Sequence, residues 1–306
     1  MPVSQRLRAR SGLFAVSGAA LLWGTTGVGV RIIHDRSGLA AVPIGCYRLA
    51  IAAVALTLVF RGPGLRRAQA ALRKHRWSLV LSGAGLGLYQ ALYFIGVQDV
   101  GVSIATLVSL AVAPVAITAV TAVTRRRMPT PGALATVGCA VVGLAMISLA
   151  AGSTSGAPHP LVGVLASLGS GLGYAATTLL NRRLTADGDP LLLTAATSAI
   201  GALVLLPLAL PFGMAWPSDP VANGWLIYIG IVSTVVAYGL FYAGLRTTPP
   251  EAAGVLTLLE PLTAAVLAAL LLHESLTPLG WAGAALLLVA IAALYVRRPE
   301  PDPPAL

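Results

Sequence analysis

Residues 258–278 read LLEPLTAAVLAALLLHESLTP and belong to an apolar run from Ala252 to Leu272. A helix of about 20 such residues is long enough to cross the hydrocarbon core of a bilayer. Glu260 stands in the first half of this run, directly before Pro261. A carboxylate in hydrocarbon is costly, and charges kept inside membrane segments usually serve a function. The stretch therefore predicts a membrane helix whose carboxylate has a role beyond folding.

The composition extends this prediction to the whole chain. Of 306 residues, 57% are hydrophobic and 10% are charged, with a mean hydropathy of +0.85. Soluble domains carry about 25% charged residues, so the composition predicts a protein folded in lipid. The net charge is +10, but the basic residues gather at the ends of apolar runs, which argues against nucleic-acid binding. Cys46 and Cys139 lie in different runs, so neither a disulfide nor a metal site is expected.

Ten apolar segments follow one another along the chain. Their length and their lack of alternation exclude the strands of a β-barrel and predict an all-α integral membrane fold. Because the first segment is too long for a signal peptide, we expect it to be retained as the first span. The predicted spans are 12–33, 39–60, 77–97, 101–124, 131–151, 160–181, 190–211, 224–245, 251–272 and 278–296.

The loop charges predict how the chain is oriented. With ten spans, nearly all of the 20 Lys and Arg residues fall on one side of the membrane. The exceptions are Arg31 and Arg36 on the other side and Arg48 inside the second span. Since basic loops stay in the cytoplasm, we expect both termini there and the protein in the inner membrane of the cell.

The two halves of the chain share a spaced pattern. Trp77 and Trp225 are 148 positions apart, as are Gly96 and Gly244, and Pro114 pairs with Pro261 after a one-residue gap. Five spans per half is an odd number, so the second half would enter the membrane from the opposite side, as in alternating-access transporters. The expected units are residues 1–151 and 152–298, each a five-helix repeat, with a disordered tail at 299–306.

Three motifs carry a family resemblance that covers nearly the whole chain. They are WGTTGV in the first span, YRLAIAA in the second, and EPLTAAVLAALLLHESLTPLGWAG from residue 260 onward. With them the chain resembles EamA-type members of the drug/metabolite transporter superfamily. The resemblance implies export or exchange of small metabolites, and it matches Glu260, Pro261 and Glu274. The first half departs from the pattern, with Ala113 before Pro114 and Arg127 in place of Glu274, which indicates an asymmetric charged site.

Only two charged residues lie well inside the spans. Arg48 and Glu260 enter from opposite sides, and each should lie about 13 Å deep at 1.5 Å per residue. We interpret them as pathway charges near the midplane that interact directly, through water or through a tyrosine. The alternative is a structural tie between two helices. Pro261 also removes the hydrogen bond to the carbonyl of Thr257, which would either expose that carbonyl to substrate or simply bend the helix.

Polar aromatic residues complete the predicted binding site. Tyr89, Gln90 and Tyr93 share one helix face, and Gln90 is the repeat partner of Tyr238. Such stripes would line a cavity between the repeats, with Trp23 of the first span either stacking on substrate or only packing. Tyr242, four residues after Tyr238, belongs either to this stripe or, because it lies close to the inner edge, to the interfacial tyrosines. The predicted substrate-binding residues are thus Trp23, Arg48, Tyr89, Gln90, Tyr93, Tyr238 and Glu260.

The sequence lacks the patterns of the main alternative functions. The runs GAGLG at 83–87 and GSGLG at 169–173 lie in mid-span, where they suit close helix contacts and not phosphate binding. Hydrolase motifs are absent. We therefore predict a secondary transporter for an amino-acid-like or drug-like metabolite, not an enzyme, with no cofactor or metal. Its expected partners are the small-molecule substrate and membrane lipid, not nucleic acid, and it would be a monomer or homodimer. A passive uniporter or channel is the alternative, and a membrane enzyme a less favoured one.

Overall fold

The computed structural model describes residues 3–60, 75–150, 159–187, 189–271 and 277–296, and within these ranges the regular elements are all helices. The predicted tail and Glu274 lie outside the described residues. The first half holds α1 (Val3–Ser37), α2 (Ala41–Val59), α4 (Arg76–Arg125) and α5 (Pro131–Ala150). The second half holds α6 (Pro160–Asp187), α7 (Pro190–Ala209), η1 (Leu210–Phe212), α8 (Pro220–Gly230), η2 (Ile231–Val236), α9 (Ala237–Leu245), α10 (Pro250–Leu256), α11 (Leu259–Leu271) and α12 (Pro278–Val296).

The described helices match the ten predicted spans closely. Nine candidate membrane spans are long and apolar enough to cross a bilayer, and one of them is the whole of α4. At 1.5 Å per residue, its 50 residues extend about 75 Å, more than twice a bilayer core. Gly101 divides α4 with a φ of 80°, a left-handed conformation that glycine adopts readily. α4 therefore makes two passes, and the all-α ten-span fold is confirmed.

Proline marks the start of most helices in the second half. α6, α7, α8, α10 and α12 all begin at a proline, whose fixed φ suits the first helical position and whose missing N–H costs nothing there. Two of these starts are also capped by an aspartate. The Asp189 side chain accepts from the amides of Leu191 and Leu192, and that of Asp219 from the amide of Ala222. Short loops can therefore reverse the chain between adjacent spans.

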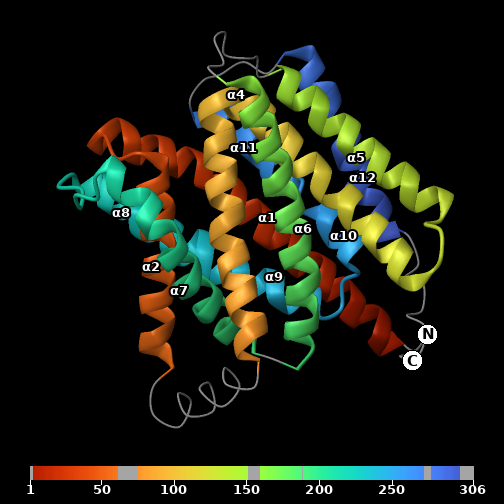
Figure 1. Ribbon diagram of the computed structural model, residues 1–306. Helices are drawn as coiled ribbons and strands as arrows, with labels where there is room; N and C mark the ends of the chain where they lie inside the picture. The colour runs from red at the N-terminus through yellow and green to blue at the C-terminus, as the bar shows by residue number, and fades with distance from the viewer. Residues whose placement is uncertain (1–2, 61–74, 151–158, 188, 272–276, 297–306) are drawn as a thin grey trace.

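The helices of the two halves pack in a matching way (Figure 1). α2 contacts α7, and α5 contacts α12, so the second and fifth spans of one half meet their counterparts in the other. α1 packs against α8, α9 and α11, while α6 packs against both passes of α4. The first span of each half thus contacts the third and fourth spans of the other, the arrangement expected of two related repeats.

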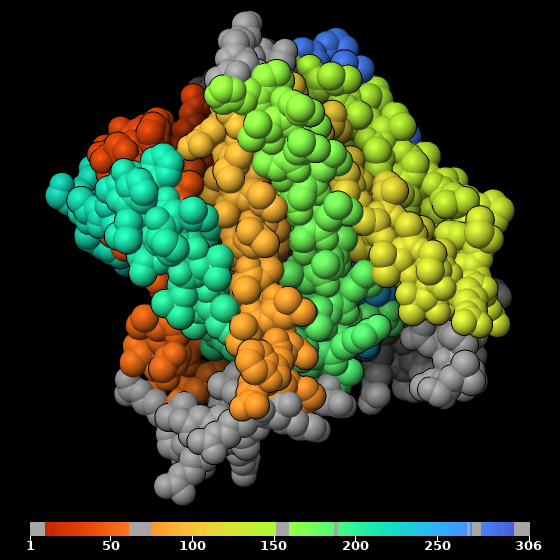
Figure 2. All heavy atoms as spheres, in the orientation of Figure 1, coloured from red at the N-terminus to blue at the C-terminus, as the bar shows by residue number. Residues whose placement is uncertain are grey.

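Glycines bring α4 and α6 together, as the mid-span glycine runs predict. A Cβ at Gly173 would lie 3.0 Å from the Tyr89 side chain, and one at Gly163 would lie 2.7 Å from that of Val100. Figure 2 shows the two helices side by side on one face, between α8 and α5. Their outer sides expose leucines suited to lipid: Leu81, Leu88, Leu165 and Leu172.

The eighth span contains a π-helical segment just before Tyr238. η2 has one residue more per hydrogen-bonded turn, and the Thr234 hydroxyl donates to the carbonyl of Ile229 five residues back. In the same segment, Ser233 donates to the Leu22 carbonyl of α1 at 3.0 Å and hydrogen-bonds Thr26. The distortion therefore fixes the eighth span against the WGTTGV motif. π segments of this kind are frequent at functional sites.

Candidate functional site

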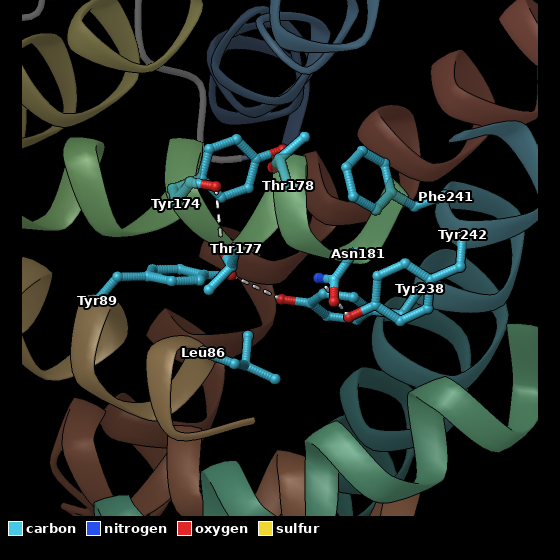
Figure 3. Close-up of a pocket in the computed structure, with 9 residues that line it drawn as sticks. All are labelled: Leu86, Tyr89, Tyr174, Thr177, Thr178, Asn181, Tyr238, Phe241 and Tyr242. Carbon is cyan, nitrogen blue, oxygen red and sulfur yellow. Dashed lines mark hydrogen bonds between the residues drawn. The ribbon is translucent and has the colours of Figure 1, made fainter. Parts of the chain in front are cut away.

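A pocket lies where α4, α6 and α9 meet, so both halves of the chain contribute to it (Figure 3). Its space is about 10 Å³, close to the minimum that one water molecule needs. Four of the lining residues are tyrosines, and most of the other lining residues are threonine or asparagine side chains from α6. The lining residues are Leu86, Tyr89, Tyr174, Thr177, Thr178, Asn181, Tyr238, Phe241 and Tyr242.

Aromatic rings pack edge to face around this pocket. The Tyr89 hydroxyl hydrogen-bonds that of Tyr238 at 3.1 Å, joining α4 to α9 (Figure 3). The Tyr89 ring meets Tyr174 of α6 at 5.5 Å between centroids and 90° between planes. Trp23 of α1 packs on Tyr238 at 4.9 Å and on Phe241 at 5.1 Å. Three of the predicted residues, Trp23, Tyr89 and Tyr238, therefore meet at one site.

A buried polar junction adjoins the pocket through Asn181 and Tyr242. Asn181 accepts a short hydrogen bond from Ser82 of α4. Its Nδ2 also reaches the Tyr242 hydroxyl at 3.4 Å, and that hydroxyl lies 3.4 Å from Thr197 of α7. All four side chains are less than 10% exposed. The two 3.4 Å contacts are long for hydrogen bonds that include a hydroxyl, so the Tyr242 contacts are the weaker ones in this junction.

Arg48 has a different partner from the one that its depth suggested. Its Nη2 donates to Oε1 of Gln90, and Nε2 of Gln90 donates to the Leu86 carbonyl at 3.3 Å. The Arg48 Nε is buried with no hydrogen-bond partner among the described residues. Two of the predicted residues are therefore in contact: Gln90 positions the Arg48 guanidinium through Nη2. The Nε of the same guanidinium is left without a partner.

Glu260 begins a new helix after a break in the ninth span. α10 ends at Leu256, α11 starts at Leu259, and the Glu260 carboxylate therefore lies in the first turn, where the helix dipole favours negative charge. The amide of Glu260 donates to the Thr257 carbonyl at 3.0 Å. The idea that Pro261 leaves that carbonyl open to substrate is therefore wrong. The Thr257 carbonyl accepts from the amide three residues later, in a tighter turn than that of an α-helix. The ninth span is therefore divided into two helices at this point and is not one bent helix.

The two membrane charges flank the tyrosines without pairing. Among the described residues, no ion pair or side-chain hydrogen bond joins Glu260 to Arg48, although the two charges interact electrostatically. Both charges interact electrostatically with Tyr238, and Glu260 does so with Tyr174 and Tyr93 as well. The structure therefore shows no direct ion pair between Arg48 and Glu260, and the links through water or through a tyrosine stay predictions.

Tyr93 stands apart from the other predicted residues. Its hydroxyl hydrogen-bonds Thr106 at 2.8 Å, across the Gly101 bend of α4, and its ring meets Phe94 at 6.1 Å. It is not among the residues that line the pocket. It does interact electrostatically with Glu260.

Sequence reasoning missed most of the α6 wall. Tyr174, Thr177, Thr178 and Asn181 occur at spacings of three, one and three, which puts them on one helix face. An asparagine in an apolar span was the available signal, because an amide in hydrocarbon needs partners. Of the two interpretations of Tyr242, the interfacial one is wrong, because Tyr242 is 1% exposed and lines the pocket.

The described residues offer little for a metal ion. They contain no group of three or more His, Cys, Asp or Glu side chains arranged to hold one. Cys46 and Cys139 are both free thiols, as predicted, and Cys46 is buried with its sulfur 3.5 Å from the Ala202 carbonyl. What the site offers instead is two opposite charges, hydroxyl groups and aromatic rings, the groups that bind a small polar organic molecule.

A helical membrane protein with two related halves and a polar aromatic pocket between them belongs to the class of multi-pass membrane transporters. The EamA-like transporter family model matches this chain twice, at residues 10–149 and 161–296. This chain belongs to the EamA-like transporter family, and the resemblance seen in its motifs is confirmed.

Relatives and one solved structure agree with this assignment. The chain is 32% identical to the uncharacterized transporter YwfM of Bacillus subtilis, over 90% of each chain. It is 29% identical to the threonine/homoserine exporter RhtA of Escherichia coli K12, over 76% of this chain and 74% of RhtA. A crystal structure of a protein aligns with a TM-score of 0.79 and 19% identity over 93% of this chain and 96% of that chain. At that identity the structural match supports the fold alone.

Proposed function

We propose that this protein is a secondary transporter that moves a small organic metabolite, amino-acid-like or drug-like, by alternating access. The observation that carries the proposal is the pocket between α4, α6 and α9, whose walls come from both halves of the chain. Binding sites of transporters with inverted repeats lie at such repeat interfaces. Exchange or export is the proposed direction, in keeping with the name of the relative RhtA.

The state of the pocket favours a carrier over a channel. A space of about 10 Å³ is too small for any organic metabolite, so helices must move before a substrate can enter. In this proposal, the buried junction of Ser82, Asn181, Thr197 and Tyr242 closes the pocket on one side. A channel would need a continuous path, whereas a carrier needs contacts that form in one state and break in the other.

Two structural features suit such a movement. η2 and the break between α10 and α11 interrupt the regular helix in two adjacent spans of the second half. Discontinuous membrane helices are typical of transporter binding sites. α1 contacts both interrupted spans. A movement of either span would therefore also move α1, which belongs to the first half.

The remaining assignments belong to the same proposal. We place the protein in the inner membrane with both termini in the cytoplasm, because of its basic loops. It acts as a monomer or homodimer whose partners are its substrate and membrane lipid. We also infer that it is not an enzyme, an assignment supported by a family and named relatives that are transporters.

Transport in reconstituted vesicles tests the proposal. Purified protein in proteoliposomes would be preloaded with unlabelled amino acids or cationic drugs, one compound per sample, and given the labelled compound outside. A carrier should accumulate label by exchange, and the accumulation should vanish when the inside compound is left out. Uptake that is indifferent to the inside compound would favour the uniporter or channel. Protein-free vesicles provide the background, and no uptake of any compound would contradict transport.

A further inference from the structure

The π-helical segment η2 separates two parts of the eighth span that have different partners. Before it, the Tyr228 hydroxyl of α8 donates to Thr25 of α1 at 3.1 Å. After it, Tyr238 of α9 packs on Trp23 and hydrogen-bonds Tyr89 in the pocket. A change of helical geometry in η2 would therefore turn the pocket tyrosine relative to α8, which is bonded to the first half of the chain.

Hydrogen bonds hold η2 in its π geometry. The Ala237 amide donates to the Val232 carbonyl, five residues back, as in a π-helix. The Thr234 hydroxyl also donates to a carbonyl five residues back, at 2.8 Å, and the Ser233 hydroxyl donates to the Leu22 carbonyl of α1 at 3.0 Å. Because π segments are rare, two side-chain bonds at this one indicate that its geometry matters for the site that follows.

A π turn contains one residue more than an α turn, and this decides which side chains reach the pocket. If η2 became α-helical while α8 stayed in place, every later residue would advance by one position, a rotation of about 100° and a rise of about 1.5 Å. Ala237 would then take the place of Tyr238 in the pocket wall. Phe241 would take the place of Tyr242, whose hydroxyl contacts Asn181. The pocket would thus gain the space of a phenol ring, and the junction would lose a hydroxyl group.

We propose that η2 is a switch of helix register that opens and closes the pocket. In the closed state, the π turn places Tyr238 and Tyr242 in the pocket wall (Figure 3). In the open state, the turn is α-helical, and Ala237 and Phe241 stand in their places. This inference rests on the proposed transport function and specifies how the substrate enters.

The neighbours of α9 can accept this shift. Tyr238 would move to the position of Gly239, where a Cβ lies 3.0 Å from Cδ2 of Leu191. That atom is the end of a flexible side chain, 38% exposed at the start of α7, so it can turn aside. Tyr242 would move to the position of Ala243, which is exposed. Its hydroxyl would then lie at the surface, where water or lipid head groups can satisfy it.

A cysteine in the pocket wall can measure how often the pocket opens. Thr178 lines the pocket and is 1% exposed. In a variant without the two native cysteines, Thr178→Cys would be introduced and the purified full-length protein treated with N-ethylmaleimide. The reagent must enter the pocket to react, so the rate of labelling follows the fraction of protein that is open.

Ser233→Ala with Thr234→Val should favour the α register. These substitutions remove the two hydroxyl bonds that hold the π turn. We expect labelling at position 178 to become about 10-fold faster, the effect of two lost hydrogen bonds on a two-state equilibrium. Thr194→Val is the matched control, because this buried hydroxyl donates four residues back within the regular helix α7. It should leave the rate unchanged.

Deletion of Val236 should hold the span in the closed register. Val236 is the last residue of η2 and is 43% exposed, so its loss removes little packing. Without the extra residue, a continuous α-helix keeps Tyr238 and Tyr242 in the pocket. We expect slower labelling than in the undeleted chain, and no acceleration when the deletion is combined with Ser233→Ala and Thr234→Val.

Val236→Ala removes part of the same side chain but keeps the extra residue, so the acceleration should persist in it. The inference is overturned if Ser233→Ala with Thr234→Val leaves the rate unchanged, or if the acceleration survives the deletion. Should the deletion variant not fold, the comparison with Thr194→Val still decides. Labelling needs no transport, so a change of register would be detected even if no compound were exchanged in proteoliposomes, and the two proposals can fail separately.

Discussion

Gly24 lies so close to the Glu260 carbonyl that a Cβ at position 24 would come within 2.8 Å of that oxygen. This glycine of the WGTTGV motif therefore sets the distance between α1 and the turn that carries the carboxylate. Gly171 of α6 approaches the Ser109 carbonyl of α4 in the same manner. In each half, the first span contacts the fourth span of the other half through a glycine.

Gly24→Ala should displace α1 from the Glu260 turn. Overpacking of this kind costs about 1–3 kcal/mol and would shift the carboxylate relative to Tyr238. We expect a lower unfolding temperature and a loss of most transport. Gly27→Ala is the matched control in the same helix, because a Cβ there meets nothing within 4 Å. Normal transport by the Gly24 variant would show that the close contact is not needed.

Gln90→Leu should destabilise the protein through Arg48. The substitution removes the acceptor of the guanidinium and leaves a buried charge with one partner fewer, at a cost of about 1–3 kcal/mol or more. It should also alter which substrates are carried, as should Tyr238→Leu in the pocket wall. Thermal unfolding and a transport panel would measure the two effects.

A second substitution tests whether that cost comes from the charge. Adding Arg48→Leu to Gln90→Leu should recover part of the lost stability, because the unpaired charge is then gone. Strictly additive effects of the two substitutions would argue against coupling between these residues.

Orientation can be measured with impermeant thiol reagents. In a variant without Cys46 and Cys139, a cysteine at Ser218, in the exposed loop before α8, should react in intact cells. A cysteine at Thr130, exposed before α5, should react only after the membrane is opened. The reverse pattern would place the termini outside and overturn the topology predicted from the basic loops.

The sequence predicted those features that are governed by hydropathy. The spans followed from apolar length, and the helix starts agree with the prolines at 131, 160, 190, 220, 250 and 278. The glycine runs were understood as packing sites because mid-span glycines have few other uses. Tyr89 and Tyr238 were found because polar aromatics stand out in an apolar span, and their hydroxyls do meet.

Side-chain partners were harder to predict because they depend on helix rotation and tilt. The predicted depths of Arg48 and Glu260 allowed the two side chains to meet. In the structure, Arg48 donates a hydrogen bond to Gln90, another predicted substrate-binding residue, instead of pairing with Glu260. The break before Glu260 and the π-helical turn of η2 change the rotational register of two spans. Tyr242 therefore points into the pocket instead of toward the interface.

Asn181→Leu should loosen the buried junction beside the pocket. The substitution removes the acceptor of Ser82 and one partner of Tyr242, so the junction loses the bonds that join α6 to α4 and α9. We expect a cysteine at Ser198, which is 1% exposed, to react faster with a permeant thiol reagent in this variant. Thr57→Val, at an exposed threonine bonded within its own helix, is the control. Unchanged reactivity would mean that the junction does not keep Ser198 shielded.

The final prediction concerns Glu260. A carboxylate that changes partner or protonation state between inward-facing and outward-facing forms explains why a charge is kept in this span. Burial favours the protonated form of a carboxylate, whereas a nearby arginine favours the ionised form. A movement of the helices that changes either influence can therefore change the protonation state of Glu260. Glu260→Gln keeps the shape and the hydrogen-bonding capacity but cannot ionise.

Glu260→Gln should therefore insert and fold nearly normally, lose most transport, and lose any dependence of transport on pH. The backbone supports normal folding, because the amide bond to Thr257 and the start of α11 do not involve the carboxylate. Asp35→Asn, at an exposed acid near the C-terminal end of α1, should transport as the unmodified protein does. The measurement is exchange in proteoliposomes from pH 5 to pH 8, with membrane accumulation checked for each variant. Transport by Glu260→Gln at the unmodified rate across that range would show that Glu260 is a structural tie, since a residue that must ionise cannot be replaced by one that never does.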